Sequence, residues 1–229
     1  MNIADSFFGH DDRILVPVGE APWRFVGNLV IDGTACTAVL VGRDIIATAA
    51  NCIFTNHGLR VHGTFTSANG QQAFIVAYLY DHRFNYNRFL ADNDQDGRNW
   101  ALLRLDHPLG DESGFAGVQA LNDGAAPVTV MQAGYAWDTG RNLAGMPACQ
   151  IVAMLRDNTL VHQCDTTRGD SGAPFFVRNG SGFDVVGVDS NYRRVPGAYI
   201  NIAVSAASFS DQIAGFAAGT TGTMVTPRH

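Results

Sequence analysis

Short runs of apolar and β-branched residues follow one another along most of the chain, and turn-forming residues separate them. Turn pairs such as Asp32-Gly33 and Asn69-Gly70 end the runs after about four to eight residues, which is the usual length of a strand. The runs are Phe25–Ile31, Thr37–Val41, Asp44–Ala50, Ala73–Tyr80, Trp100–Leu105, Val128–Gln132, Gln150–Leu155, Leu160–Gln163, Phe175–Arg178, Phe183–Asp189 and Ala198–Ala203. The pattern therefore predicts a chain made mostly of short strands.

Only one segment has the pattern of a helix. Ser205–Phe216 begins with a residue that caps helices, continues with apolar residues at helical spacing and is followed by Gly219. Earlier, Asn179-Gly180-Ser181-Gly182 lies between two runs and predicts a β-hairpin. Because no helical crossovers separate the strands, the pattern favours an all-β double barrel or sandwich over a parallel sheet. A boundary near Asp111–Val118 would give two halves of similar size.

Composition and charge narrow the class of partner. The chain has 229 residues, of which 46% are hydrophobic and 16% charged, as expected of a globular protein with a sizeable core. Its net charge of −6, without any basic run, argues against nucleic acid or an anionic membrane surface as a partner. No apolar stretch is long enough to span a membrane, and the first residues lack the pattern of a signal peptide. We expect either an intracellular protein or a mature segment that has lost its leader.

The four cysteines form two closely spaced pairs, Cys36 with Cys52 and Cys149 with Cys164. The spacing does not suit zinc, and no metal or cofactor motif occurs elsewhere, so neither is expected. Two pairs that each close a short loop favour disulfides, although four buried thiols are the alternative. Disulfides would indicate an oxidising compartment, and therefore a secreted or periplasmic mature segment.

The sharpest chemical motif is Gly169-Asp170-Ser171-Gly172-Ala173-Pro174. Glycines around a serine allow a tight loop that exposes the hydroxyl. The same loop can direct the N–H groups of Gly169 and Ser171 at one point, which is the arrangement of an oxyanion hole. A plain turn is the alternative interpretation of these six residues alone.

Further motifs in the same order give this loop a context. Thr48-Ala49-Ala50-Asn51-Cys52 resembles the Thr-Ala-Ala-His-Cys block of trypsin-like serine peptidases, and Asn99–Leu105 resembles the strand that carries their catalytic acid. Three other segments are similar to the bacterial branch that includes the glutamyl endopeptidases: Asp11–Val16 with Pro22-Trp23, Cys164–Arg168, and Val185–Asp189 with Tyr199–Asn201. The resemblance covers about residues 11–215.

The resemblance implies a chymotrypsin-like fold of two six-stranded antiparallel β-barrels with a C-terminal helix. The barrels would occupy residues 14–115 and 116–204, followed by the helix at 205–216 and a loose tail at 217–229. It also implies a peptide or protein substrate cleaved through Ser171, with no cofactor. The sequence does not specify an oligomeric state.

The departures from the family pattern concern the two residues that activate the serine. Asn51 stands where the family has its catalytic histidine, and Asn99 stands where it has its aspartate. An amide nitrogen is not basic near neutral pH, so Asn51 cannot take the serine proton. No substitute base is expected from the other candidates, which are His57, His62, His82, His162, Asp94 and Asp96.

Specificity and activation are less constrained by the sequence. The resemblance places Asp165, Thr166 and Asp189 near the specificity pocket, where two acids would favour a lysine or arginine side chain of the substrate. The alternative is that Asp165 caps a turn and Asp189 faces solvent. A glutamate preference loses its support because Asp189 stands where that branch has histidine.

Asp170 has a partner in trypsin-like enzymes, namely the new N-terminal amine made by activation cleavage. Here the candidate partners are an amine freed by cleavage at Arg13-Ile14, the Arg168 side chain, or solvent.

Two function classes remain open: an inactive or weak serine endopeptidase, whether altered deliberately or by nature, and a natural pseudopeptidase that binds a partner in the cleft. A purely structural domain would explain the cysteines but not the serine loop.

Overall fold

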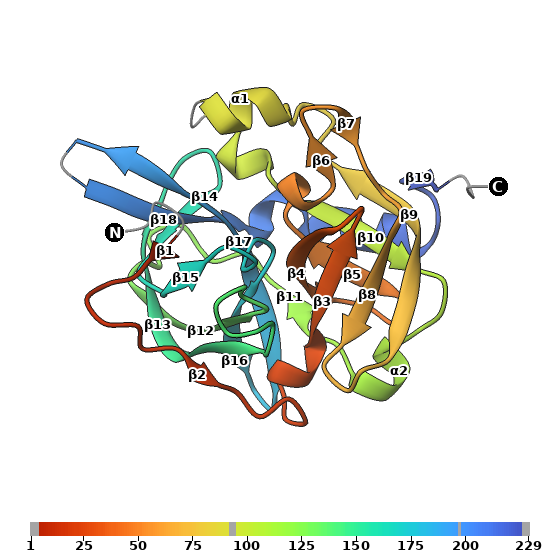
Figure 1. Cartoon of the computed structure of the whole chain (residues 1–229), viewed down its shortest axis with the longest axis horizontal. Helices are drawn as coiled ribbons and strands as arrows, with labels where there is room; N and C mark the ends of the chain where they lie inside the picture. Colours follow the sequence, from red (N-terminus) through yellow and green to blue (C-terminus); the bar gives the residue numbers. More distant parts are fainter. Residues whose placement is uncertain (1–4, 92–94, 197, 226–229) are drawn as a thin grey trace.

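The first half of the chain closes into a barrel. The computed structural model describes residues 5–91, 95–196 and 198–225. Six antiparallel strands follow the order β10-β5-β4-β3-β8-β9, and pairing of β9 with β10 closes the ring (Figure 1). Their bounds are β3 (Val26–Ile31), β4 (Thr34–Leu40), β5 (Ile45–Thr48), β8 (Gly63–Ser67), β9 (Gln72–Tyr80) and β10 (Ala101–Leu105).

The second half forms a matching barrel beside the first. Its order is β17-β16-β12-β13-β14-β18, closed by the pairing of β17 with β18. The bounds are β12 (Val128–Gly134), β13 (Ala144–Met154), β14 (Thr159–His162), β16 (Pro174–Asn179), β17 (Gly182–Val195) and β18 (Ala198–Ser205). The expected pair of six-stranded antiparallel barrels is confirmed, and so is the hairpin at Asn179–Gly182, which joins β16 to β17.

Shorter elements connect and flank the barrels. The N-terminal part contributes β1 (Asp5–Ser6), β2 (Ile14–Leu15), η1 (Trp23–Phe25), η2 (Ala50–Cys52), β6 (Phe54–Thr55), β7 (Gly58–Leu59) and α1 (Tyr86–Ala91). The remainder contributes η3 (Asp96–Arg98), α2 (Gly110–Ser113), β11 (Gly117–Val118), β15 (Thr166–Thr167), η4 (Ala206–Ser208), η5 (Ser210–Gln212), α3 (Ile213–Ala217) and β19 (Thr223–Met224).

Alternating side chains fill each barrel and the seam between them. In β9, Ala73, Ile75 and Ala77 are buried while Phe74 is exposed, the period of two expected of a strand with one face on a core. A cluster of buried residues from both barrels, including Val39 and Phe176, packs along the seam. This apolar seam fixes the two barrels against each other, and the candidate site lies on it.

The C-terminal segment differs from the single helix expected over 205–216. The structure divides it into η4, η5 and α3, because Phe209 has φ −140° and interrupts the helical backbone. Phe209 is fully buried, so packing of its ring outweighs continuation of the helix. Ser205 does cap the segment as expected, since its hydroxyl oxygen accepts the Ala207 N–H at 3.2 Å.

Several elements were not expected from the pattern, among them β8, α1 and β19. Strand β8 is short and rich in threonine, and α1 is only six residues long. The expectation of a loose tail from residue 217 is wrong for residues 223–225, because β19 pairs with β9 and the Val225 N–H donates to the Val76 carbonyl at 2.8 Å. Residues 226–229 lie outside the described residues.

Both expected disulfides are present, Cys36–Cys52 and Cys149–Cys164, and the alternative of free thiols is excluded. They span sequence separations of 16 and 15 residues. Loops of this size correspond to about 3 kcal/mol each in the chain-entropy model. Cys52 directly follows Asn51, so the first disulfide also fixes one residue of the candidate site.

Candidate functional site

The serine loop lies between β15 and β16 and reaches the seam between the barrels. Gly169 and Gly172 both have positive φ angles, +108° and +85°. A Cβ on Gly172 would lie 2.2 Å from the Thr37 carbonyl oxygen, so only glycine fits there. Thr37 also holds the loop directly, because its N–H donates to the Ser171 carbonyl and its hydroxyl donates to the Gly169 carbonyl, both at 3.0 Å. Ser171 is thus clamped by a strand of the opposite barrel.

Asn51 and Asn99 meet at the end of β5 and the start of β10. The backbone N–H of Asn51 donates to Asn99 Oδ1 at 2.7 Å. Asn99 Nδ2 donates to Asn51 Oδ1 at 2.9 Å and lies 2.7 Å from Ser190 Oγ in β17. Asn99 is fully buried, and these contacts use both ends of its amide.

The orientation of both amides follows from one backbone donor. A backbone N–H can only donate, so the atom of Asn99 that faces it must be the oxygen. The nitrogen of Asn99 then faces the oxygen of Asn51, which leaves the nitrogen of Asn51 toward the serine. Asn51 Nδ2 lies 3.4 Å from Ser171 Oγ.

The serine hydroxyl therefore has a donor on one side and an acceptor on the other. Asn51 Nδ2 donates toward a lone pair of Ser171 Oγ, and the hydroxyl proton is directed to the Ser190 carbonyl at 3.4 Å. Neither neighbour can remove the proton at neutral pH. The geometry brings the three sequence-predicted residues together, yet it holds the serine as a neutral hydroxyl.

Two backbone N–H groups of the serine loop are the candidate donors of an oxyanion hole. Among the described residues, the N–H groups of Gly169 and Ser171 donate to no backbone acceptor. Neighbouring N–H groups are used instead to shape the loop, since Gly172 donates to the Asp189 carbonyl at 2.8 Å. Two such uncommitted donors can stabilise negative charge on a carbonyl oxygen bound beside Ser171.

None of the alternative bases that the structure describes reaches the serine. His57, His62 and His82 are absent from the lining of the cleft around Ser171, and His162 is buried beneath it. Asp96 pairs with Arg193, while Asp94 lies outside the described residues. No group of three His, Cys, Asp or Glu residues in the described part of the chain is placed to hold a metal ion.

The cleft beside Ser171 has a volume of about 310 Å³. Thr166 and Asp189 line it. Asp165 does not, because its carboxylate accepts the N–H groups of Phe8 and Asp12 at 2.8 and 2.9 Å. Asp165 thus binds the N-terminal segment, and the expectation of two acids in the pocket reduces to one.

Asp189 has a buried partner behind the cleft. His162 Nε2 lies 3.1 Å from Asp189 Oδ1, and the other ring nitrogen of His162 faces the Cys164 N–H at 3.3 Å. Burial raises the pKa of the Asp189 carboxyl above its usual value, and the contact with His162 offsets part of that rise. The Asp189 carboxylate is therefore already in hydrogen-bond contact with a ring nitrogen before any ligand arrives.

Sequence reasoning missed several residues of the cleft, namely Tyr86, Ser190, Asn191 and Tyr192. Ser190 matters most, because it contacts both Asn99 and Ser171. It lies within a long strand and belongs to no motif of its own. Its position one residue after Asp189 was the available signal.

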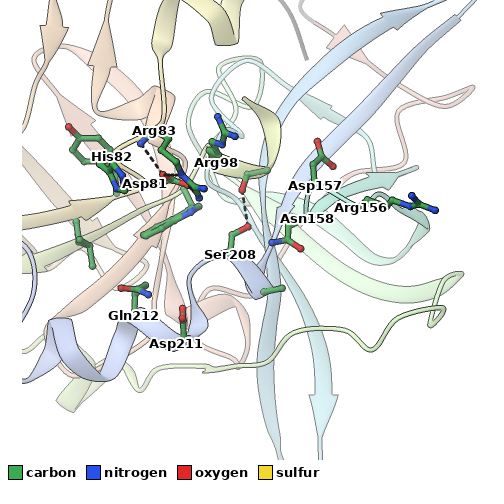
Figure 2. Close-up of a pocket in the computed structure, with 15 residues that line it drawn as sticks. Asp81, His82, Arg83, Arg98, Arg156, Asp157, Asn158, Ser208, Asp211 and Gln212 are labelled. Carbon is green, nitrogen blue, oxygen red and sulfur yellow. Dashed lines mark hydrogen bonds and ion pairs between the residues drawn. The ribbon is translucent and has the colours of Figure 1, made fainter. Parts of the chain in front are cut away.

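A larger cavity of about 630 Å³ lies elsewhere along the junction of the barrels and shares no lining residue with the cleft (Figure 2). Arg83 and Asp81 form an ion pair on one side of it, and Ser208 donates to the Gly97 carbonyl at 2.8 Å. Its arginines and aspartates are equal in number, with Arg83, Arg98 and Arg156 against Asp81, Asp157 and Asp211. The balanced charge indicates no particular ligand.

Comparisons with known proteins agree with this fold. None of the curated proteins matches the chain in sequence. Among solved structures, a Glu endopeptidase matches at 19% identity with a TM-score of 0.77, covering 93% of this chain and 100% of that chain. The protease Anisep from Arthrobacter nicotinovorans matches at 18% identity and TM-score 0.61, covering 81% and 91%.

The thermostable serine protease AL20 from an extremophilic microorganism matches at 16% identity and TM-score 0.66, covering 86% of this chain and 98% of that chain. At such identities these likenesses establish the fold alone. The family model described as Trypsin matches residues 16–213, which is most of the sequence. The chain belongs to the trypsin family.

Proposed function

We propose that this chain binds peptide or protein segments in its cleft and does not hydrolyse them at a detectable rate. The observation that carries the proposal is the hydrogen-bond chain Asn99–Asn51–Ser171, in which an amide occupies each position that needs a titrating group. The cleft, the loop donors and the apolar seam are all retained, so binding does not depend on the missing chemistry.

The step that the site lacks is activation of the Ser171 hydroxyl. Peptide hydrolysis requires a group that accepts the serine proton and then returns it to the leaving amine. Asn51 presents an N–H donor to the hydroxyl instead. A serine without a base is a weak nucleophile at neutral pH. An oxyanion hole and binding alone leave a residual rate of roughly 10³–10⁴ over water, far below that of an active peptidase.

The second candidate function is that of a slow serine endopeptidase. The loop donors of Gly169 and Ser171 favour it, because they would stabilise the transition state if any base were supplied. The two candidates make different predictions for the same peptide, namely retention of the intact peptide or slow appearance of fragments.

Binding without turnover can be measured directly. We expect labelled peptides to bind saturably in fluorescence anisotropy, while mass spectrometry finds them intact after long incubation. A fluorophosphonate should label Ser171 only slowly. The matched control is Ser171→Ala, which removes only the hydroxyl and should bind peptides with nearly unchanged affinity. Rapid labelling and cleavage by the unmodified chain would show that a base has been overlooked and would end the proposal.

The cleft is further proposed to prefer a basic side chain, through Asp189 alone. We expect benzamidine to bind more tightly than its neutral analogue benzamide or the anion benzoate, and Asp189→Asn to remove the difference. Because burial raises the pKa of Asp189, the preference should fade on acidification at a higher pH than for an exposed aspartate.

The titratable groups around Asp189 are His162 and Asp170, with the Arg13 guanidinium beyond Asp170. Isothermal titration calorimetry with the three ligands between pH 5 and 8 provides the measurement. Equal weak binding of all three would remove the basic preference while leaving peptide binding itself untouched.

An extracellular or periplasmic location is proposed on the strength of the two disulfides, which persist in oxidising compartments. In the part of the chain that the structure describes, no helix has the length and apolar character needed to cross a bilayer.

A further inference from the structure

The N-terminal segment before the first barrel is attached to the serine loop of the second barrel. We call residues 5–13 the arm; it runs along the outside of the second barrel beside β15 (Figure 1). Strand β1 pairs with β15, which forms part of the cleft wall. Asp165, just before β15, accepts two N–H groups of the arm. The arm is thus fastened to the segment that leads into Ser171.

The side chain of Arg13, the last residue of the arm, is buried although it carries a full charge. It is 3% exposed. The Nε and Nη2 atoms both lie 2.9 Å from the Asp11 carboxylate, and Nη2 and Nη1 lie 2.5 and 3.3 Å from Asp138. The Phe7 ring covers the guanidinium at 4.9 Å. Four of the five guanidinium N–H donors are therefore committed.

The remaining donor faces Asp170, the residue before the serine. Arg13 Nη1 lies 3.8 Å from Asp170 Oδ2, and the same oxygen accepts the Thr167 N–H at 2.8 Å. Asp170 is buried, and its Oδ1 has no hydrogen-bond partner. Gly134 makes room for it, since a Cβ there would lie 2.2 Å from Asp170 Oδ1. Arg168, the other cation considered from the sequence, lies exposed on the cleft instead.

The bond that follows Arg13 is held on both sides. Ile14 and Leu15 form β2, which pairs with Gly145 and Ala144 of β13, and the Val16 N–H donates to Leu143. Cleavage at this bond would require the strand to detach.

We propose that Arg13 is a positioning residue that holds the serine loop from within the intact chain, so that the loop takes its shape without cleavage of the Arg13–Ile14 bond. The inference deepens the proposed function, because it concerns how the same site is held. It is tested on the order of the loop, which can be measured whether or not the chain hydrolyses peptides.

The chain carries its own optical reporter for Asp170. The Trp137 indole N–H lies 3.2 Å from Thr167 Oγ1, and the Thr167 N–H in turn contacts Asp170. Trp137 is 54% exposed, whereas Trp23 and Trp100 are buried. Burial raises the pKa of Asp170 to about 8, while the charge of Arg13 lowers it and those of Asp189 and Asp138 raise it. Asp11 and His162 lie behind these neighbours.

The experiment compares Arg13→Gln and Arg13→Lys with the unmodified full-length chain. Loss of the cation should move the pH midpoint of Trp137 fluorescence upward, because the ionised form of Asp170 loses its attractive neighbour. Hydrogen exchange at the Thr167, Asp170, Gly172 and Ala173 amides should quicken at least about tenfold as the loop opens locally. Arg13→Lys should restore part of both effects.

Two further variants make the test specific. Asp138→Asn removes a neighbouring negative charge and should move the midpoint in the opposite direction, downward, even if Arg13→Gln fails to fold. Arg43→Gln removes an arginine that is likewise paired with an aspartate, Asp111, but on the first barrel, and should change neither readout. An unchanged midpoint in both Arg13→Gln and Asp138→Asn, or equal effects in Arg43→Gln, would overturn the proposal.

Discussion

Asn51→His together with Asn99→Asp is expected to raise peptide turnover by at least about 10³ over either single substitution, because members of a catalytic triad act as a unit. The three positions already lie in hydrogen-bond contact with one another. Position 51 faces Ser171 Oγ, position 99 faces position 51, and the two loop donors are uncommitted. Only the two titrating groups are absent.

Each single substitution should fail for its own reason. With Asn51→His alone, Asn99 Oδ1 still accepts the backbone N–H of residue 51, so Nδ2 must face the imidazole. That donor favours the tautomer whose proton points at Ser171 and leaves no lone pair for it. With Asn99→Asp alone, the carboxylate would turn the Asn51 amide so that its oxygen faces the serine, and an amide oxygen is still not a base.

Turnover of a fluorogenic peptide series, read beside fluorophosphonate labelling of Ser171, provides the measurement. Ser171→Ala added to the double variant should abolish the gain, which separates hydrolysis by this site from contamination. A double variant that folds and binds peptide yet remains inactive would show that the loop donors or the cleft are themselves unfit for catalysis.

Arg193→Met is expected to lower the free energy of unfolding by about 3–5 kcal/mol, the usual result of removing one partner of a buried ion pair. Arg193 in β17 pairs with Asp96 in η3, and their side chains are only 9% and 4% exposed. Arg193 Nε lies 2.9 Å from Asp96 Oδ2, and the Phe89 ring covers the guanidinium at 4.9 Å. The variant would leave the Asp96 carboxylate buried without this counter-ion.

Urea denaturation measures the loss. The matched control is the double variant Asp96→Asn with Arg193→Met, which removes both charges and should recover much of the stability. Arg43→Gln, which breaks the exposed ion pair with Asp111, should change stability little. A loss below about 1 kcal/mol for Arg193→Met would show that water or another group solvates Asp96 on its own.

The barrels could be predicted from the sequence because their strands carry a strong signal. Runs such as Phe183–Asp189 are mostly apolar, bounded by turn residues and long enough to stand out. Strand β8 lacks this signal, since Phe65 is its single large apolar residue. It becomes a strand through pairing with β3 and β9, and such long-range pairing leaves no local mark.

The candidate site was predictable where motifs carry it and not where tertiary contacts do. Asn51, Asn99 and Ser171 each lie in a recognisable block, and the structure brings them together. The misplacement of Asp165 has a different cause. Its spacing from Ser171 suggests a pocket residue, but two backbone N–H groups of the arm bind its carboxylate. These partners are 157 and 153 residues away in the sequence, so local spacing gives no sign of them. Ser190 was missed for the same reason.

Each end of the chain pairs with the barrel that lies farther from it in the sequence. At the start, β1 of the arm and the following strand β2 pair with β15 and β13 of the second half, and β19 near the end returns to pair with β9 of the first barrel. Each barrel is therefore held by a terminal segment that lies next to the other barrel in chain order. A force that pulls the two ends of the chain apart would act on these terminal pairings before it acted on either barrel. We therefore expect the two barrels to stay together until one of the terminal strands has lost its pairing.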